Sequence, residues 1–274
     1  MKPNPLKQSL LYIVSIGYAL ISLFPLFLML VSSVKPNIEI FTKPLSLPSE
    51  LSFASYKTLF VKLNYFSYIQ NSIFVSAVTL VVLLIFSVML SYYIARFDFK
   101  WNGLLFFYFL IGMMLPIKLG LVPLFLLIKD LHLVNSLWSI ILIQVGSGIP
   151  MAVLILTGFF RTLPKELEEA GKIDGASNMG LLMKILLPLM RPALGTVTIV
   201  NFIGVWNDFF FPMIFIQDEA KKTIPVGMLK LFSEFTTDWS VLFAGLTLSS
   251  LPMIIIFIFA SRQFMDGLTA GAVK

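Results

Sequence analysis

The residues best suited to chemistry or recognition gather between Leu163 and Pro192, the longest charged and polar run near the middle of a very apolar chain. Together with the preceding turn, this run holds Arg161, Lys165, Glu166, Glu168, Glu169, Lys172, Asp174, Lys184 and Arg191. The sequence has no nucleophile paired with a general base, no cluster of metal ligands and no G-x-x-x-x-G-K-[ST] phosphate loop. We therefore expect neither a catalytic nor a metal site, and we interpret the charged run as a docking surface.

Local signals predict that this run folds as two short helices with a tight corner between them. Pro164 suits the first turn of a helix, and the glutamates after it lie near the positive end of the helix dipole. Gly175 can end that helix in the left-handed conformation, and Ser177 can cap a second helix over Asn178 to Leu187. Pro188 then stops or kinks the second helix. Helices this short are marginally stable alone, so we expect them to need a partner surface.

An amphipathic hairpin lying on lipid headgroups is an alternative interpretation of the same run. It would need no protein partner. The clustered glutamates argue modestly against it, because they would lie beside an anionic surface.

The composition of the chain indicates that most of it is solvated by lipid. The chain has 274 residues, of which 58% are hydrophobic and 12% charged, and its mean hydropathy is +0.93. Soluble domains carry about 25% charged residues, and a soluble protein with an oversized core does not explain recurrent long apolar runs. The net charge of +6 is better explained by membrane topology and anionic lipid than by nucleic acid. Because there is no cysteine, the sequence excludes disulfide and thiol chemistry.

Six nearly uncharged segments are long enough to cross a bilayer core of about 30 Å as helices. They lie at roughly 10–34, 70–94, 103–128, 136–160, 193–216 and 241–261. The first is too long for a signal peptide and lacks a cleavage site, so we keep it as a span. The predicted fold class is an all-α polytopic membrane protein of six transmembrane helices, with the charged loop at 161–192. No linker divides the chain, which predicts one transmembrane domain over 1–274.

The arginines set the predicted orientation. With both termini inside, all four arginines of the chain lie on the inner side, at Arg96, Arg161, Arg191 and Arg262. The positive-inside rule then favours cytoplasmic termini and a cytoplasmic charged loop.

The charged loop resembles a motif of the membrane subunits of bacterial ATP-binding-cassette importers. That motif is Glu-Ala-Ala, three residues, Gly, nine residues and Ile-x-Leu-Pro. The matching residues are Glu169, Ala170, Gly171, Gly175, Ile185, Leu187 and Pro188, and residues 176–184 are the intervening nine. The departure is Gly171 in place of the second alanine, which loosens the first helix slightly. The variant Ile173-Asp174-Gly175-Ala176 resembles the carbohydrate-uptake branch.

The resemblance extends over nearly the whole chain. Further matching features are Asn71-Ser72, Pro123-Leu124, Trp206-Asn207-Asp208-Phe209 and the tail at 267–274, which is similar to that of maltose-transporter G-type permeases. It implies a permease core at about 68–262 and a multi-pass protein of the bacterial inner or plasma membrane.

The resemblance also implies partners and roles. The chain would form half of a translocation pore with a second homologous permease, and would work with two ATPase subunits and an extracytoplasmic sugar-binding protein. It would bind no cofactor itself, and ATP and Mg would bind to the ATPase subunits. Glu169 would make the polar contact to the ATPase, and Gly175 would permit the corner. The residues expected to couple the two proteins are Glu169, Ala170, Gly171, Asp174, Gly175, Ala176, Ile185, Leu187 and Pro188.

Polar residues inside the spans are candidates for the translocation path. Lys118 lies in the third span beside Pro116, where a charge is costly unless it faces the bundle interior, water or the headgroups. Asn201, Trp206, Asn207 and Asp208 lie in the fifth span and combine an apolar face with hydrogen-bonding groups, as sugar recognition requires. The alternatives are snorkelling for Lys118 and polar contacts between helices for the other residues. Gln144 and the run Gly146-Ser147-Gly148 are more typical of close helix packing.

The predicted function is therefore the permease subunit of an ATP-driven sugar importer. Glycerol phosphate or another small polar solute is an alternative cargo. A membrane enzyme lacks support for the reasons given above. A secondary transporter usually shows internal repeats, which this chain lacks. The residues leave open which sugar is carried and which of the two permeases holds the pore site.

Overall fold

A computed structural model describes residues 5–232 and 237–272, and these are helical with no strand among them. The last two residues of the tail motif at 267–274 lie outside the described residues. The α-helices are α1 (Pro5–Ser33), α2 (Asn37–Thr42), α3 (Ala54–Lys62), α4 (Tyr65–Arg96), α5 (Asn102–Met114), α6 (Leu121–Asp130), α7 (Leu137–Thr162), α8 (Glu166–Ile173), α9 (Asn178–Gly180), α10 (Leu187–Leu189), α11 (Arg191–Trp206), α12 (Phe210–Phe215), α13 (Ile224–Gly227) and α14 (Trp239–Ala272). Short 3-10 turns occupy Ile117–Gly120, Glu219–Lys221 and Met228–Leu231, and a π-helix occupies Leu181–Leu186.

Four straight helical stretches of the described chain are long and apolar enough to cross a membrane. They are Gln8–Ser33, Tyr65–Arg96, Leu137–Thr162 and Trp239–Phe259. They coincide with the predicted first, second, fourth and sixth spans. Two bent helix pairs bring the number to six when each pair counts as one span. The chain is thus an all-α polytopic membrane protein, as the sequence predicts.

The predicted third span is broken rather than straight. Its two helical parts, Asn102–Met114 and Ile117–Asp130, meet at 83°. The break falls at Pro116, which has no N–H to donate and which forces Leu115 into an extended conformation (φ −81°, ψ 122°). A proline favours a bend at such a point, and here the chain changes direction almost completely.

The predicted fifth span is also interrupted. α11 ends at Trp206 and α12 begins at Phe210, so that Asn207, Asp208 and Phe209 lie in a break between them. At its other end α11 meets the stretch Asn178–Leu189 at 77°. Of the residues chosen from the sequence, Asn207 and Asp208 thus lie in the break, whereas Asn201 and Trp206 belong to α11.

The chain packs as two compact units, one within residues 1–66 and 227–251 and the other within residues 67–226 and 252–274. The prediction of a single domain over 1–274 with a permease core at about 68–262 remains a prediction. In the first unit, the Tyr65 hydroxyl donates to the Gly245 carbonyl at 2.6 Å, and the buried Lys35 ammonium donates to the Lys43 carbonyl at 3.0 Å. Residues 8–31 of α1 include no buried residue, as expected of a helix that lies against lipid or another subunit.

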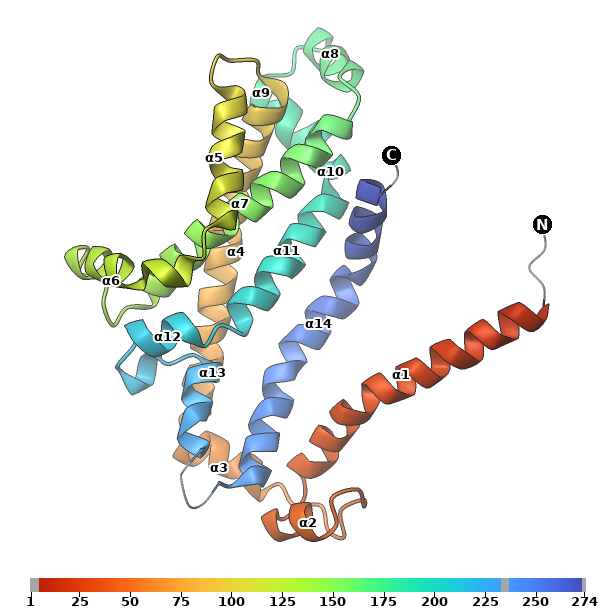
Figure 1. Cartoon of the computed structure of the whole chain (residues 1–274), viewed down its shortest axis with the longest axis vertical. Helices are drawn as coiled ribbons and strands as arrows, with labels where there is room; N and C mark the ends of the chain where they lie inside the picture. Colours follow the sequence, from red (N-terminus) through yellow and green to blue (C-terminus); the bar gives the residue numbers. More distant parts are fainter. Residues whose placement is uncertain (1–4, 233–236, 273–274) are drawn as a thin grey trace. The chain divides into compact units, whose positions relative to one another are not determined.

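The second unit holds the main core, which α4, α7 and α11 build together. Leu83, Leu156 and Val197, one from each of these helices, are wholly buried in this core. Figure 1 shows the three helices running past one another. Gly148 lets them approach closely, because a Cβ there would lie 2.5 Å from Asn201 Oδ1 and closer still to the Leu83 side chain. Leu182 and Leu186, from the charged run, belong to the same core. One core therefore joins the long helices to the candidate docking segment.

Near the start of α4, polar side chains hold the segment 217–226. Asn71 donates its side-chain amide to the carbonyls of Ala220 and Lys222 at 2.8 and 2.9 Å, and the Ser72 hydroxyl accepts from the Ile224 N–H at 2.9 Å. The Tyr68 hydroxyl donates to the Glu219 carboxylate. We call this set of contacts the α4 start latch.

Asn135, in the turn before α7, holds the beginning of the same segment. Its side-chain oxygen accepts from the N–H groups of Gln217 and Asp218 at 3.0 and 2.9 Å, and its own N–H donates to the Phe215 carbonyl at 2.8 Å. Its φ of 61° is left-handed, a conformation that asparagine tolerates better than most residues. Its side chain therefore organises the turn and the segment together.

Candidate functional site

The charged run folds as two short helices with a corner between them, and together we call residues 161–192 the coupling segment. Its first helix, α8, starts at Glu166, two residues after the predicted start at Pro164. Glu166, Glu168 and Glu169 lie in its first turn and Lys172 in its last, which suits both ends of the helix dipole.

Gly175 ends α8 as the sequence predicts. Its φ of 79° is left-handed, its N–H donates to the Lys172 carbonyl at 3.0 Å, and the Ala176 N–H donates to the Gly171 carbonyl at 2.9 Å. These two bonds form the Schellman motif that closes a helix at a left-handed residue. Any other side chain at this position would strain the corner.

The second helix begins at the predicted cap and continues further than predicted. The Ser177 hydroxyl accepts from the Gly180 N–H at 3.2 Å. Helical structure runs on to Leu189, two residues past the predicted end at Leu187, and the chain then turns by 77° into α11, so the helix ends close to Pro188 as expected. Pro188 lies in the first turn of α10, directly after a π-helical stretch in which Leu187 donates to the Leu182 carbonyl. The wide π turn accommodates a residue that has no N–H of its own.

Gly171 has a packing role that the sequence did not indicate. It is buried against the second helix, and a Cβ there would lie 2.8 Å from Ile185 Cδ1 and closer still to Leu181. The sequence-based interpretation was only that glycine loosens α8. The structure shows that the missing side chain lets α8 lie directly on the second helix.

The predicted coupling residues separate into an outward and an inward set. Glu169, Ala170, Asp174, Gly175 and Pro188 are exposed, whereas Gly171 is buried, and Ala176, Ile185 and Leu187 are half-buried. Ile173, which was not singled out for a role, is 86% exposed at the tip of α8. An apolar tip beside an exposed carboxylate is a surface that a protein partner can cover.

Glu168 differs sharply from its neighbour Glu169. Its Oε1 lies 2.6 Å from Nε of Arg96, the last residue of α4, and only 11% of its side chain is exposed. The Arg96 guanidinium also donates to the Leu163 carbonyl at 2.9 Å. In the sequence, Arg96 served only to predict the membrane orientation of the chain, because no local pattern pairs residues so far apart.

A second polar group lies at the two helix breaks of the second unit. The Gln144 side-chain amide of α7 donates to the Asp208 carboxylate at 2.6 Å. The Lys118 ammonium lies 4.8 Å from the centre of the ring of Phe210, two residues after Asp208. The structure therefore pairs Asp208 with Gln144, which the sequence had favoured as a packing residue, and places Lys118 against the neighbouring Phe210.

The other candidate path residues do not join this group. Trp206 is buried and stacks on Phe202, with ring centres 5.5 Å apart. Asn201 bonds to the Val197 carbonyl and lies against Gly148. Asn207 is exposed and bonds to the Ile203 carbonyl and Met253 Sδ.

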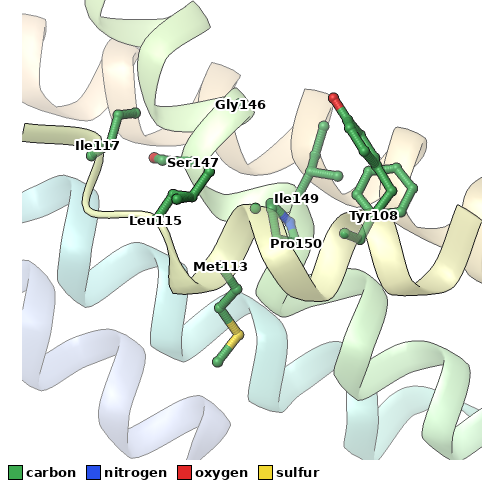
Figure 2. A pocket seen from close by; sticks show the side chains of 10 residues that line it. Tyr108, Met113, Leu115, Ile117, Gly146, Ser147, Ile149 and Pro150 are labelled. Carbon is green, nitrogen blue, oxygen red and sulfur yellow. The ribbon is translucent and has the colours of Figure 1, made fainter. Parts of the chain in front are cut away.

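A cavity of about 470 Å³ lies where α5 packs on α7, beside the break of the third span. Figure 2 shows Tyr108 and Met113 from α5 and Ser147 and Pro150 from α7 around it. Pro116 and Pro150 lack an N–H, so the carbonyls of Gly112 and Gly146 lose their helical partners. An apolar cavity with few polar groups is typical of a small-ligand pocket.

Comparisons with known proteins agree with this architecture. The family described as "Binding-protein-dependent transport system inner membrane component" matches residues 87–268. The arabinooligosaccharides transport system permease protein AraQ of Bacillus subtilis is 36% identical over 260 residues, which cover 93% of this chain and 92% of that protein. The probable starch degradation products transport system permease protein AmyC of Thermoanaerobacterium thermosulfurigenes is 29% identical over 274 residues, covering all of both chains.

Solved structures share the fold. A chain of a bacterial ABC transporter involved in alginate import superposes with a TM-score of 0.82 at 22% identity, covering 96% of this chain and 98% of that chain. A chain of the alginate transporter in complex with an alginate pentasaccharide-bound periplasmic protein superposes with a TM-score of 0.68 at 14% identity, covering 94% and 93%.

Proposed function

This chain belongs to the family of inner membrane components of binding-protein-dependent transport systems, as a permease of an ABC importer, and from that premise we propose that it carries a sugar or oligosaccharide. In this proposal it forms half of the pore with a second homologous permease. Two ATPase subunits bind ATP and Mg and drive the cycle, and an extracytoplasmic binding protein delivers the cargo. The chain itself binds no cofactor and performs no hydrolysis.

The coupling segment is the observation that carries the proposal. Its inward face is fixed to the core through Leu182 and Leu186, whereas its outward face presents Glu169 and Ile173. A partner that binds the outward face can therefore displace the ends of the long helices. We assign Glu169 the polar contact to the ATPase and Gly175 the corner that gives the segment its shape.

The same proposal sets the orientation of the chain. The coupling segment must lie in the cytoplasm, where ATP is available, and Arg96 and Arg161 lie at the same end of the second unit. Their position supports cytoplasmic termini under the positive-inside rule.

Two observations support a sugar as the cargo. Relatives that cover nearly the whole chain are named for arabinooligosaccharides and for starch degradation products. In addition, the residues at the two helix breaks include the side-chain amide of Gln144 and the carboxylate of Asp208, groups that can hydrogen-bond to the hydroxyls of a sugar. The Gln144–Asp208 pair and the cavity beside Tyr108 supply the hydrogen-bonding groups and aromatic surface that sugars require.

Charge reversal on the coupling segment tests the proposal. In the importer reconstituted in vesicles with its binding protein, we expect Glu169→Lys to abolish ATP-dependent uptake and to release the ATPase subunits, while membrane insertion stays normal. Asp98→Lys is the matched control, because Asp98 is also exposed, lies in the loop after α4 and undergoes the same charge change. Uptake by the purified chain alone on a proton or sodium gradient would overturn the proposal.

A further inference from the structure

We propose that Arg96 is a positioning residue for transport, because its buried ion pair with Glu168 pins the coupling segment to α4 and makes the two move as one body. The inference rests on the proposed function in one respect, namely that a partner ATPase moves α8. It adds a specific route by which that movement enters the long helices.

The geometry of Arg96 spans the connection between α7 and α8. Its Nε lies 2.6 Å from Glu168 Oε1, in the first turn of α8, and its Nη2 donates to the Leu163 carbonyl at 2.9 Å, just after α7. One planar guanidinium therefore holds both sides of the turn that leads into the docking helix. Lysine, with a single ammonium, cannot reproduce this two-point contact.

Burial helps the Arg96–Glu168 pair to hold a fixed geometry. The side chains of Arg96 and Glu168 are 4% and 11% exposed. Tyr92, one turn earlier on α4, lies within reach of both charges and packs on Phe160 of α7, with ring centres 5.7 Å apart. Screening by salt and water is weak in such a site, so the pair holds a fixed geometry better than an exposed pair would.

The neighbouring glutamates divide two tasks between them. Glu169 is exposed and available to a partner, whereas Glu168 is turned toward α4. A force applied at Glu169 reaches Arg96 through one residue of helix backbone. By contrast, the covalent route from α8 to α4 runs back through α7, α6, the 3-10 turn Ile117–Gly120 and α5.

α4 can carry this displacement across the membrane. It has 32 residues, which gives a length of about 48 Å at 1.5 Å per residue. Arg96 is its last residue, while Asn71 and Ser72 hold the segment 217–226 near its beginning. A tilt of α4 imposed through Arg96 therefore also displaces the segment 217–226, which the α4 start latch holds near the other end of the helix. Alternating access requires such a movement on both sides of the membrane.

Removing or exchanging the charges of Arg96 and Glu168 tests the role of this ion pair in the reconstituted importer. We expect Arg96→Gln and Glu168→Gln each to lower the amount of substrate transported per ATP hydrolysed by about tenfold, while the ATPase subunits still copurify and still hydrolyse ATP. Arg96→Lys should be intermediate. The exchange Arg96→Glu with Glu168→Arg should recover part of the lost coupling. The control is Lys100→Gln, because Lys100 is exposed in the loop after α4, outside the coupling segment, and contacts the Trp101 ring.

Distance measurements test the same idea in the unaltered pair. The chain has no cysteine, so Tyr93→Cys on α4 and Lys172→Cys on α8, both exposed, can carry spin labels without background. We expect their separation to stay constant between nucleotide-free and ATP-bound importer, and to change in the Arg96→Gln background.

Two results would overturn the proposed role of the Arg96–Glu168 pair. One is normal transport per ATP in both single variants. The other is a change of separation by about one helical turn, ~5 Å, when ATP binds to the importer with Arg96 intact. Either result leaves the proposed function standing, because that function fails only if the ATPase subunits do not bind or are not needed for uptake.

Discussion

At the end of α4, Arg96 meets Glu168 as a buried ion pair, whereas near its start Asn71 and Ser72 bind backbone groups of the segment 217–226. The first contact depends on two side chains, and removing one leaves a buried charge unpaired at a cost of about 3–5 kcal/mol. The second consists of neutral hydrogen bonds worth about 0.5–1.5 kcal/mol each. The contact at the end of α4 is therefore sensitive to single substitutions. The contact near its start is less sensitive, because its stability is distributed over several residues.

Gly171→Leu should give the largest effect in this comparison, because it separates the two helices of the coupling segment. The added side chain would collide with Leu181 and Ile185, and overpacking of this kind costs up to about 3 kcal/mol. We expect loss of uptake and of ATPase copurification, together with faster proteolysis within 161–192. The matched control is Gly158→Leu on α7, where a Cβ meets open space. Equal behaviour of the two variants would show that α8 does not depend on close packing.

Asn135→Ala should give an intermediate effect at the opposite end. It removes the acceptor for two N–H groups and leaves alanine in a left-handed conformation, a combined loss of about 2 kcal/mol. We expect faster amide exchange over 217–222 with unchanged ATPase binding. Asn135→Asp keeps an acceptor oxygen and should exchange like the unaltered chain. Unchanged exchange in the alanine variant would place the stability of this segment in the α4 start latch alone.

The two serine caps give the smallest expected difference. Ser177 caps the short helix of the coupling segment, and Ser136 caps α7, which has 26 residues. Each serine-to-alanine change costs about 1 kcal/mol. We expect Ser177→Ala to lower uptake about twofold and Ser136→Ala to leave it unchanged, since a long packed helix absorbs the loss of one cap. Equal uptake in both variants would mean that the start of the second helix does not contribute to coupling.

Local signals in the sequence predicted the features that depend on only a few neighbouring residues. The left-handed Gly175 and the cap at Ser177 fall into this class, and both are found in the structure. The apolar runs likewise predicted where the long helices lie, because span length follows from bilayer thickness.

Features that depend on residues distant in the chain could not be predicted from local sequence signals. Arg96 and Glu168 are 72 positions apart, as their numbers show, and nothing in either neighbourhood specifies the other. The close approach at Gly171 depends on how two helices fold back on each other, and the Gln144–Asp208 bond depends on how α7 meets the break after α11. The π-helical stretch Leu181–Leu186 before Pro188 was also not predicted, and the helix ends at Leu189 instead of Leu187.

The break in the third span has a consequence for how this chain is handled in the cell. Leu115 and Ile117 flank Pro116 in an unwound stretch and are 66% and 39% exposed. Hydrocarbon cannot hydrogen-bond to the peptide groups that the break leaves without helical partners, so in the proposed assembly the second permease, or a water-filled path beside it, covers this stretch. A copy made without its companion would be a substrate for membrane proteases. Its abundance should therefore follow that of the companion subunit, which enforces equal stoichiometry without any dedicated regulator.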